Sequence, residues 1–501
     1  MKAKTTVFLL TQKIAVFAVI FPFFLSSPAS SLFAQDTTWH ERMYLATGEY
    51  APNSNWHAIL RFEISDTLSS EPGSVQYTPD ATMPVQQCLD DTVMLNFGHG
   101  VYVDETNNRL YLATIFTNQG NVLTTNTDTA VGSIAIFNNL SSITGAQPPD
   151  RHIFGDSTGL KQPHGCWLDE SRDMLYVANA FGGNILVYEN ADSADGNIVP
   201  DRTIAHDSLG APVFVYLDEM VDRLFVCAMP LGPGTKPQVL IYNNASTLNG
   251  TPDPDIRIAG LSTRLNLINS TVHNCWFNPV DELLAVGHHT NELLMFDLSG
   301  INWNPASTDV LDLAPRVIRV DDPSLGHDST DVNLYGFFWD LETDRMFCSV
   351  GVDNPGGGPA LDAPPNSVKV FDSISDSTVS GITIPSRFIY WDNGGTYYPP
   401  QPIWIEKYMI ITGIEEKNLI RGFRLYPNPS EALVHLRFAE RASDVNIAVA
   451  DVTGKEIFRL EEKEILPGRE FSIDATDFGS GLYVIRVSCN EGTWTGKMKI
   501  E

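Results

Sequence analysis

The sequence has few cysteines and few basic residues, and both shortages exclude classes of protein. Its six cysteines, in 501 residues, include no CxxC pair and no closely spaced framework. This pattern is not that of a small disulfide-built fold or of a cysteine zinc site, although an exported protein can oxidise its cysteines. Lys and Arg number 32 against 61 Asp and Glu, a formal net charge of −29. A body this acidic repels nucleic acid and anionic membranes, so neither is expected as a partner, while Ca²⁺ or a cationic ligand stays open.

Motifs that would identify a reaction are also missing. The chain has no P-loop and no HExxH helix, so these routes to nucleotide chemistry and zinc proteolysis have no support. A Ser-His-Asp triad assembled by the fold stays open, because these residue types are common. The sequence alone names no substrate.

Long apolar runs are scarce, and the one near the start has the features of a secretory signal. Lys2, Lys4 and Lys13 precede or border the run IAVFAVIFPFFL (14–25), and small residues and LFAQD follow. The run is short for a membrane span and contains Pro22. We expect a signal peptide at 1–34, and no transmembrane segment in the mature chain.

A recurring unit occupies the middle of the chain. Each copy has an apolar strand, a polar turn at Asp, Asn or Glu, and a second apolar strand. The copies are FGHGVYVDETNNRLYLAT (97–114), QPHGCWLDESRDMLYVAN (162–179), APVFVYLDEMVDRLFVCA (211–228), TVHNCWFNPVDELLAVGH (271–288) and NLYGFFWDLETDRMFCSV (333–350). A third strand follows each, such as NILVYEN (184–190). A fourth follows a proline and carries an arginine: Arg151, Arg202, Arg257, Arg316 and Arg387.

Four strands in each copy, repeated about every 60 residues, is typical of a β-propeller. A closed ring of such sheets buries both faces of each and removes exposed edges. The stretch 41–65 supplies a second and third strand without a first, and QPIWIEKYMIITG (401–413) supplies a first strand. We therefore predict an all-β fold, a six-bladed propeller at 36–413 closed by joining these two stretches. Seven blades is the alternative, with YMIITG as an additional strand.

The blade sequences resemble NHL and YncE-like secreted bacterial propellers. The resemblance is clearest in SADGNIVPDRTIAH (193–206), with its G-N-x-x-P-x-R-x-I pattern. It covers about 370 residues and implies a fold rather than an activity.

The composition changes after Gly413, and residues 414–501 read as short alternating strands with turns at NPS, TGK and GSG, the pattern of a small Ig-like β-sandwich. This segment resembles the type A C-terminal sorting domain of the type IX (Por) secretion system of Bacteroidetes. The residues that carry the resemblance are Tyr426, Pro427, Asn428, Pro429, Asp451, Gly454, Lys455, Ser480, Gly481, Tyr483 and Lys497. It implies the type IX machinery as a partner, and a secreted or outer-membrane surface-attached protein.

The first strands open with residues that could line a shared axial channel. The aligned positions hold His99, His164, Val213, His273, Tyr335 and Gln401. Three imidazoles converging there could bind Zn²⁺ or another divalent metal, an arrangement similar to that of peptidyl-hydroxyglycine amidating lyases, which are six-bladed propellers. The histidines fall on units two, three and five, which is not three-fold, and no matching Arg and Tyr pattern is present. Histidines repeated only for packing are the alternative.

Other recurring residues have structural interpretations. Asp104, Asp169, Asp218, Asn278 and Asp340 occupy one turn position, where Asp and Asn bind their own backbone. The fourth-strand arginines are expected to pair with acids between blades. Cysteines at equivalent positions are expected to be buried hydrophobes. The stretch DSADGN (192–197) has a weak likeness to a Ca²⁺ loop without the later Glu.

Taken together, these features predict a secreted or cell-surface propeller that binds an extracellular glycan, peptide or protein. The alternative is a metal-dependent propeller enzyme, a lyase or lactonase, that uses the axial histidines with Zn²⁺ or Ca²⁺. The ligand site expected in either case is the axial opening lined by His99, His164, His273, Tyr335 and Gln401.

Overall fold

The computed structural model is almost entirely β-structure. It describes residues 36–47, 58–64, 73–77, 79–84, 93–119, 132–230, 236–266, 272–288, 292–320, 332–352, 367–383, 385–391, 400–412, 423–426, 430, 432–438, 441–451, 455–466, 469–490 and 492–500. The helical elements in these ranges are 3-10 turns: η4 (Leu140–Ser142), η5 (Asp156–Thr158), η6 (Ala180–Gly182) and η7 (Ala245–Thr247). The predicted signal peptide (1–34) and Pro427, Asn428, Pro429 and Gly454 lie outside the described residues. Two compact units separate: Trp39–Tyr408, and Met409–Glu501 with Met1–Thr38.

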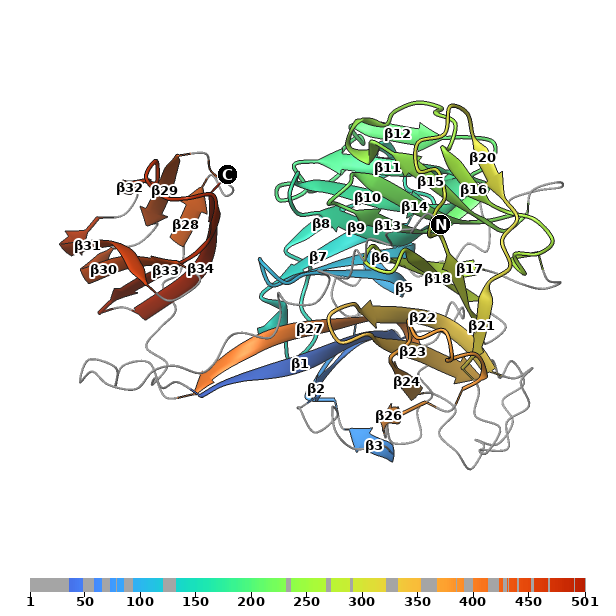
Figure 1. Ribbon diagram of the computed structural model, residues 1–501, viewed down its shortest axis with the longest axis horizontal. Coiled ribbons are helices and arrows are strands. Elements are labelled where there is room, and N and C mark those ends of the chain that lie inside the picture. The colour runs from blue at the N-terminus through green and yellow to red at the C-terminus, as the bar shows by residue number, and fades with distance from the viewer. Residues whose placement is uncertain are drawn as a thin grey trace, which may run out of the picture. The chain divides into compact units, whose positions relative to one another are not determined.

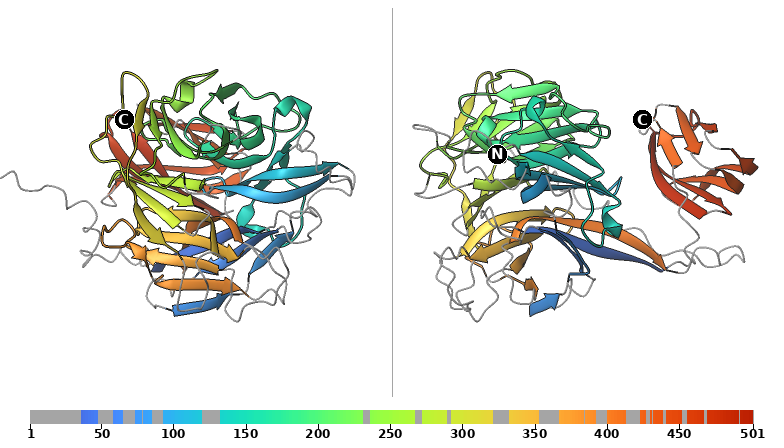
Figure 2. Two further views of the ribbon diagram at one scale, coloured as in Figure 1. Left: turned by 90° about the vertical axis from the view of Figure 1, so that its right-hand side faces the viewer. Right: turned by 180° about the vertical axis from the view of Figure 1, so that it is seen from behind.

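The described part of the first unit forms six antiparallel sheets, each built on four strands, in the manner of a β-propeller (Figures 1 and 2). Five of the sheets are continuous in sequence, as the repeat predicts. In order from the inner strand outward they are β5 (Val93–Asp104), β6 (Arg109–Gln119), β7 (Ser133–Asn138), β8 (Arg151–Ile153); β9 (Pro163–Asp169), β10 (Met174–Asn179), β11 (Asn184–Glu189), β12 (Arg202–Ala205); β13 (Ala211–Asp218), β14 (Arg223–Met229), β15 (Gln238–Asn243), β16 (Ile256–Ile258); β17 (Val272–Asn278), β18 (Leu283–His288), β19 (Glu292–Asp297), β21 (Arg316–Arg319); and β22 (Val332–Asp340), β23 (Arg345–Val352), β24 (Ser367–Asp372), β26 (Arg387–Trp391).

The remaining sheet joins the two ends of the unit, as predicted. Its order is β27 (Pro400–Thr412), β1 (Asp36–Thr47), β2 (Ala58–Ile64) and β4 (Ala81–Pro84). In Figures 1 and 2 the orange β27 lies beside the blue β1. Since β27 runs unbroken to Thr412, the residues YMIITG do not form a separate strand. Within the described residues, an additional strand at YMIITG therefore has no support.

The outer edge of a sheet is covered by the segment that connects the third and fourth strands of the next sheet around the ring. Parallel strands β20 (Asp309–Leu311), β25 (Gly381–Ile382) and β3 (Gly73–Tyr77) lie against β16, β21 and β26. Single parallel bridges do the same for two further sheets, Gly196 on Ile153 and Gly250 on Ile204. Because an unpaired edge is a template for aggregation, this coverage protects the protein from edge-to-edge association.

Arginines join neighbouring sheets, but through carbonyl groups instead of acids. Nη1 of Arg151 donates to the carbonyl oxygens of Ala191 and Ala194. Nη1 of Arg202 donates to those of Ala245 and Leu248. The expected acid pairs between blades were wrong: the carboxylate partners of Arg202 and Arg387, Glu189 and Asp372, lie on the adjacent strand of the same sheet. A turn with unsatisfied carbonyl oxygens is an acceptor that composition does not reveal.

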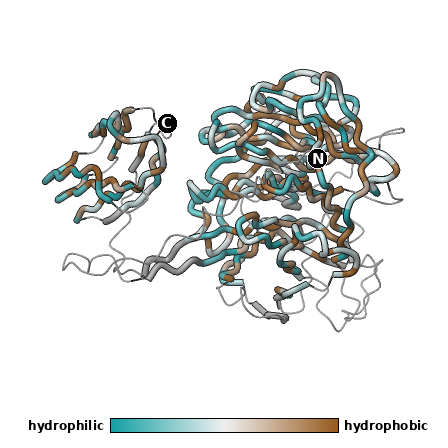
Figure 3. The backbone as a smooth tube through the Cα atoms, viewed as in Figure 1, coloured by the Kyte–Doolittle hydropathy of each residue, from teal (hydrophilic) through white to brown (hydrophobic). Residues whose placement is uncertain are grey.

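The core of the first unit follows the alternation of its strands. Figure 3 shows brown, hydrophobic residues along the strands of each unit. The four described cysteines of this unit, Cys166, Cys227, Cys275 and Cys348, are free thiols buried in it, which confirms their prediction as small hydrophobes. Among the residues described, no helix is long and apolar enough to cross a membrane.

The second unit pairs a three-stranded sheet with a four-stranded sheet. The first sheet contains β28 (Phe423–Tyr426), β29 (Leu433–Phe438) and β32 (Glu470–Asp474). The second contains β31 (Glu456–Ile465), β30 (Ala442–Asp451), β33 (Gly481–Cys489) and β34 (Gly492–Ile500). Buried and exposed side chains alternate along β32, and its inward residues join a separate hydrophobic core. This arrangement is the expected small β-sandwich.

Candidate functional site: the axial channel and its two mouths

Six aromatic side chains fill the centre of the first unit, one from the inner strand of each sheet. They are Tyr102, Trp167, Tyr216, Trp276, Phe338 and Trp404, none more than 8% exposed. Neighbouring ring centroids lie 4.7–5.4 Å apart all the way around. The three indoles also meet each other at 5.2–5.9 Å. This aromatic plug divides the axial channel into two separate mouths.

Along each inner strand, the residues of the two mouths lie at fixed sequence distances from the plug residue. The histidine positions come three residues before the aromatic ring, as in His164 and Trp167, and the turn acids come two residues after it, as in Asp169. In a regular strand, residues three apart point to opposite faces. The strand must therefore depart from regular pairing between His164 and Trp167 if both side chains are to face the axis.

β-Bulges supply that irregularity. Pairing between the first and second strands shifts register beside His99, His164, Val213 and Tyr335, and across His273. A bulge inserts one extra residue and turns the following side chains to the other face, which is why bulges often occur beside functional sites. The predicted convergence of these positions thus depends on five equivalent bulges.

In two sheets the residue after the bulge is a glycine, Gly100 or Gly165, and the backbone of the neighbouring inner strand lies close to it. A Cβ on Gly100 would lie 2.5 Å from the carbonyl oxygen of His164, and one on Gly165 would lie 3.0 Å from that of Val213. Any larger residue would push the neighbouring sheet outward. The repeated His-Gly pair at 99–100 and 164–165 is therefore explained by close backbone approach as well as by the imidazole.

The structure brings the three histidines together. The ring centroids of His99 and His164 lie 4.4 Å apart, and those of His99 and His273 5.9 Å apart. Tyr335 meets His273 edge to face at 6.2 Å. Burial lowers the pKa of His164 well below its usual value, and the charge of His99 lowers it further. Nδ1 of His164 is shielded from solvent and has no hydrogen-bond partner among the described residues.

The hollow at this imidazole mouth is small. Its free volume is about 20 Å³, between residues that include His99, His273, Tyr335 and the plug residue Trp404. That is room for about one water molecule or ion. Within the described parts of the chain, no group of three His, Cys, Asp or Glu side chains has a geometry that could hold a metal. The imidazoles are packed ring against ring, and this arrangement does not fit Zn²⁺ as it stands.

On the other side of the plug, called the glutamate mouth below, lie glutamates that the sequence interpretation did not single out. Glu105, Glu170 and Glu219 each follow the repeated turn Asp. Tyr102 and Trp404 of the plug donate to Glu170 and Glu105, both at 3.1 Å. Burial raises the pKa of Glu105 to about 7, with the Trp404 hydrogen bond opposing and Glu406 adding to the shift. Burial, then Asp169 and Glu170, raise the pKa of Glu219 to about 7.

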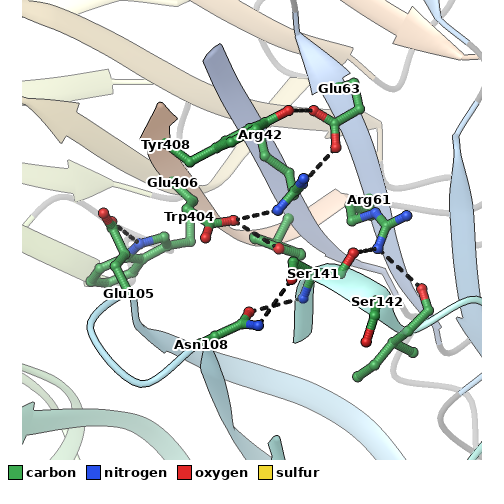
Figure 4. A network of polar contacts seen from close by, with 12 residues as sticks. Arg42, Arg61, Glu63, Glu105, Asn108, Ser141, Ser142, Trp404, Glu406 and Tyr408 are labelled. Carbon is green, nitrogen blue, oxygen red and sulfur yellow. Dashed lines mark hydrogen bonds and ion pairs between the residues drawn. The ribbon is translucent and has the colours of Figure 1, made fainter. Parts of the chain in front are cut away.

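A polar network holds the closing sheet at this glutamate mouth (Figure 4). Arg42 on β1 lies between Glu406 on β27, at 3.1 Å, and Glu63 on β2, at 2.6 Å. Tyr44 also donates to Glu406, at 2.9 Å. Arg42 and Glu406 are largely buried. Since they come from distant parts of the sequence, this ion pair fastens the joined sheet.

The remaining predicted residues have structural roles or lie outside the described side chains. The side chain of Gln401 is among the latter. The turn acids accept backbone N–H groups as predicted, for example Asp104 from Asn107 at 2.8 Å and Asp169 from Arg172 at 3.0 Å. In the stretch 192–197, Asp195 accepts from the backbone of His152, so it tethers a turn.

In the second unit, the described residues that match the sorting-domain motifs take part in the hydrogen bonds and strand pairing of the sandwich. The hydroxyl of Tyr483 donates to the carbonyl oxygen of Gly479 at 2.5 Å. Asp451, the last residue of β30, accepts the backbone N–H of Lys455 at 3.1 Å. Lys497 pairs across the ladder with Val484 on β33, and Gly481 with Ile500.

The described sheets define an all-β class of protein, a propeller-like unit and a β-sandwich. Residues 424–501 match the family of secretion system C-terminal sorting domains, which confirms the resemblance found in the sequence. This domain directs export by the type IX secretion machinery to a secreted or cell-surface-attached state.

Comparison with other proteins adds no activity. No curated protein matches the chain. Among solved structures, a periplasmic gluconolactonase from Pseudomonas aeruginosa is similar at 11% identity and a TM-score of 0.42, over 87% of this chain and 99% of that one. A nidogen/laminin complex gives 11% and 0.39, over 74% and 98%. Hydrazine synthase from Kuenenia stuttgartiensis gives 13% and 0.36, over 64% and 75%. Likenesses this distant assign neither an activity nor the NHL or YncE subfamily.

Proposed function

We propose that the protein is a binding or interaction protein that the type IX system delivers to the cell surface or the medium. Its ligand would be an extracellular glycan, peptide or protein. The observation that supports this most is the aromatic plug. About 20 Å³ is free at the imidazole mouth, which is small for a sugar or a peptide, and this supports recognition on the outer surface.

A glycan and peptide array probed with the mature propeller tests this proposal. We expect reproducible binding to one chemical class of ligand. The control is the same protein unfolded and refolded without regaining its near-UV circular dichroism. Equal signals from both preparations, or turnover of a lactone or peptide substrate by the native protein alone, would contradict a binding role.

Metal-dependent catalysis at the imidazole mouth is the second candidate. The proximity of His99, His164 and His273 favours it, and the ring packing opposes it. Metal analysis of protein purified without chelator, beside the variant with all three changed to Ala, separates the two. Stoichiometric Zn²⁺ or Ca²⁺ in the native protein alone would favour the enzyme. We expect none, and no thermal stabilisation by either ion.

We also propose the processing scheme: a signal peptide at 1–34, a propeller at 36–413 and a sorting domain at 414–501. In the sorting domain, the residues that carry the resemblance would form the export signal. A secretable reporter fused to 414–501 should reach the surface, and Tyr483→Ala should reduce its export. Export of the reporter without 414–501 would contradict this assignment.

A further inference from the structure

One hollow on the outer surface of the first unit is much larger than the axial one. It has about 300 Å³ of free volume and lies where β15 begins and β16 ends, the end of the sheet that also carries the histidine positions. Its charged residues are Lys236, Arg257 and Asp207; amide and hydroxyl groups of Gln238, Asn266 and Ser208 also line it. The volume suits a ligand the size of a monosaccharide.

Arg257 reaches this hollow because of a one-residue difference in register. In the β9–β12 sheet, Arg202 lies opposite Val187. In the β13–β16 sheet the equivalent third-strand residue, Ile241, lies opposite Ile256, and Arg257 comes one residue later. A shift of one residue places a side chain on the other face of a strand. Arg257 therefore does not occupy the position from which Arg202 joins the neighbouring sheet.

The positions equivalent to Arg257 in the other sheets show that the arginine is specific to this place. They hold Thr203, His152, Val317 and Phe388, each opposite the corresponding third-strand residue. In the sequence, Arg257 was grouped with the fourth-strand arginines that join neighbouring sheets. The strand pairing shows that Arg257 occupies a different position and does not belong to that group.

The guanidinium of Arg257 is held in place but left with unused capacity. Its Nε and Nη2 donate to Oε1 of Gln238, at 3.1 and 2.8 Å. Gln238 is 4% exposed and in turn donates to the carbonyl oxygen of Ser208 at 2.5 Å. Among the described residues, Arg257 has no carboxylate partner. A fixed guanidinium with a free edge is well suited to bind a carboxylate.

The far wall is equally fixed. The backbone N–H of Ser262 donates to Asp312 at 2.7 Å, and Asn266 donates to the carbonyl oxygen of Gly260 at 3.0 Å. Gly260 has φ +139°, and a Cβ there would lie 2.3 Å from Asp312. The wall is thus set before any ligand arrives, which lowers the entropic cost of binding.

We infer that this hollow binds a sugar acid, a monosaccharide-sized ligand with one carboxylate. Two cations and Asp207 give the lining a net charge of +1, which balances a monoanion and would leave one charge of a phosphate dianion uncompensated. The polar groups of Ser208 and Gln238 suit sugar hydroxyls. This inference rests on the proposed binding function and names a ligand class for it.

Calorimetric titration of the mature full chain with D-glucuronate, at low salt and pH 7, tests the inference. We expect saturable binding with a Kd of about 1 mM, and at least about tenfold weaker binding of neutral D-glucose because the charge-assisted bonds are lost. Inorganic phosphate should also bind more weakly. Tighter binding of phosphate or of glucose than of glucuronate would overturn the assignment.

Variants locate the binding. Arg257→Gln should weaken glucuronate about tenfold, and the exposed Lys236→Gln about threefold. Arg319→Gln is the matched control, an arginine at the same end of the β17–β21 sheet paired with Glu292; it should change nothing. Lys236→Gln keeps the test valid if Arg257→Gln fails to fold. Unchanged affinity in Lys236→Gln and in folded Arg257→Gln would overturn the site, while an array ligand unaffected by either would leave the binding function standing.

Discussion

The two mouths of the axial channel are built on the same six strands, yet they carry opposite chemistry. One gathers imidazoles at β-bulges, and the other gathers carboxyl groups beyond the turn acids. Burial beside the aromatic plug disfavours charge at both. It lowers the pKa of His164 and raises the pKa of Glu105 and Glu219. One physical cause therefore gives opposite responses to pH at the two mouths.

Removing a plug residue should break this comparison most completely. Trp404 touches Tyr102 and Phe338 at ring-centroid distances of 4.8 and 5.2 Å and donates to Glu105. We expect Trp404→Ala to lower the free energy of unfolding of the propeller by about 3–5 kcal/mol, because a large cavity would connect the two mouths. Urea unfolding followed by tryptophan fluorescence measures this.

The exposed aromatic residue Phe181 serves as the control for the plug. Its side chain is 42% exposed, so Phe181→Ala should change the stability by less than about 0.5 kcal/mol. Similar losses for Trp404→Ala and Phe181→Ala would show that the plug does not hold the ring together.

The closing ion pair offers the second largest effect, and it belongs to the glutamate mouth alone. Arg42→Met leaves Glu406, which is 7% exposed, without its cation. Breaking a buried pair in this way should cost about 3 kcal/mol. Arg459→Met, which removes an exposed pair with Glu456 in the second unit, should leave the stability almost unchanged. Chemical unfolding measures both, and equal effects would contradict a role in closure.

How much of this arrangement the sequence could predict depends on periodicity. The repeated strands led to the propeller and to the joined sheet, and the fixed position of His99, His164 and His273 led to their convergence. The plug could have been predicted from the sequence, since an aromatic residue comes two places before each repeated turn Asp or Asn and before Glu406. The displacement of Arg257 was also within reach, since it comes three residues after Pro254 whereas Arg202 comes two after Pro200; only the strand pairing shows that it places Arg257 in a different position of the sheet. The size of the imidazole hollow also depends on packing that no pattern encodes.

Acid should destabilise the imidazole mouth. The folded-state pKa of His164 lies below its unfolded value, so its contribution to stability is present above the unfolded pKa, about 6.5, and is lost as the pH falls. We expect the unfolding temperature of the native protein to fall by a few degrees between pH 7 and pH 5 through this group. His164→Gln should remove that part of the slope.

A control histidine distinguishes this effect from general acid sensitivity. His435 lies in the second unit beside Glu470, at 2.9 Å. His435→Gln should leave the pH dependence of the propeller transition unchanged. An unaltered slope in His164→Gln would mean that the imidazole mouth tolerates charge.

The glutamate mouth should show the smallest effect and the opposite sign. The pKa of Glu105 and that of Glu219 are raised to about 7, above the unfolded value of about 4.3. The folded state therefore binds more protons between about pH 4.3 and 7, and these groups reduce stability progressively as the pH rises through that interval. Solvent screening keeps the effect to about one or two degrees in unfolding temperature. The double variant Glu105→Gln/Glu219→Gln should equal the native protein at pH 4.5 and exceed it at pH 8, while the exposed Glu456→Gln shows no such crossover. If the double variant is instead less stable than the native protein at pH 8, Arg172 or solvent stabilises these carboxylates more than burial destabilises them. The two mouths would then not respond to pH in opposite directions.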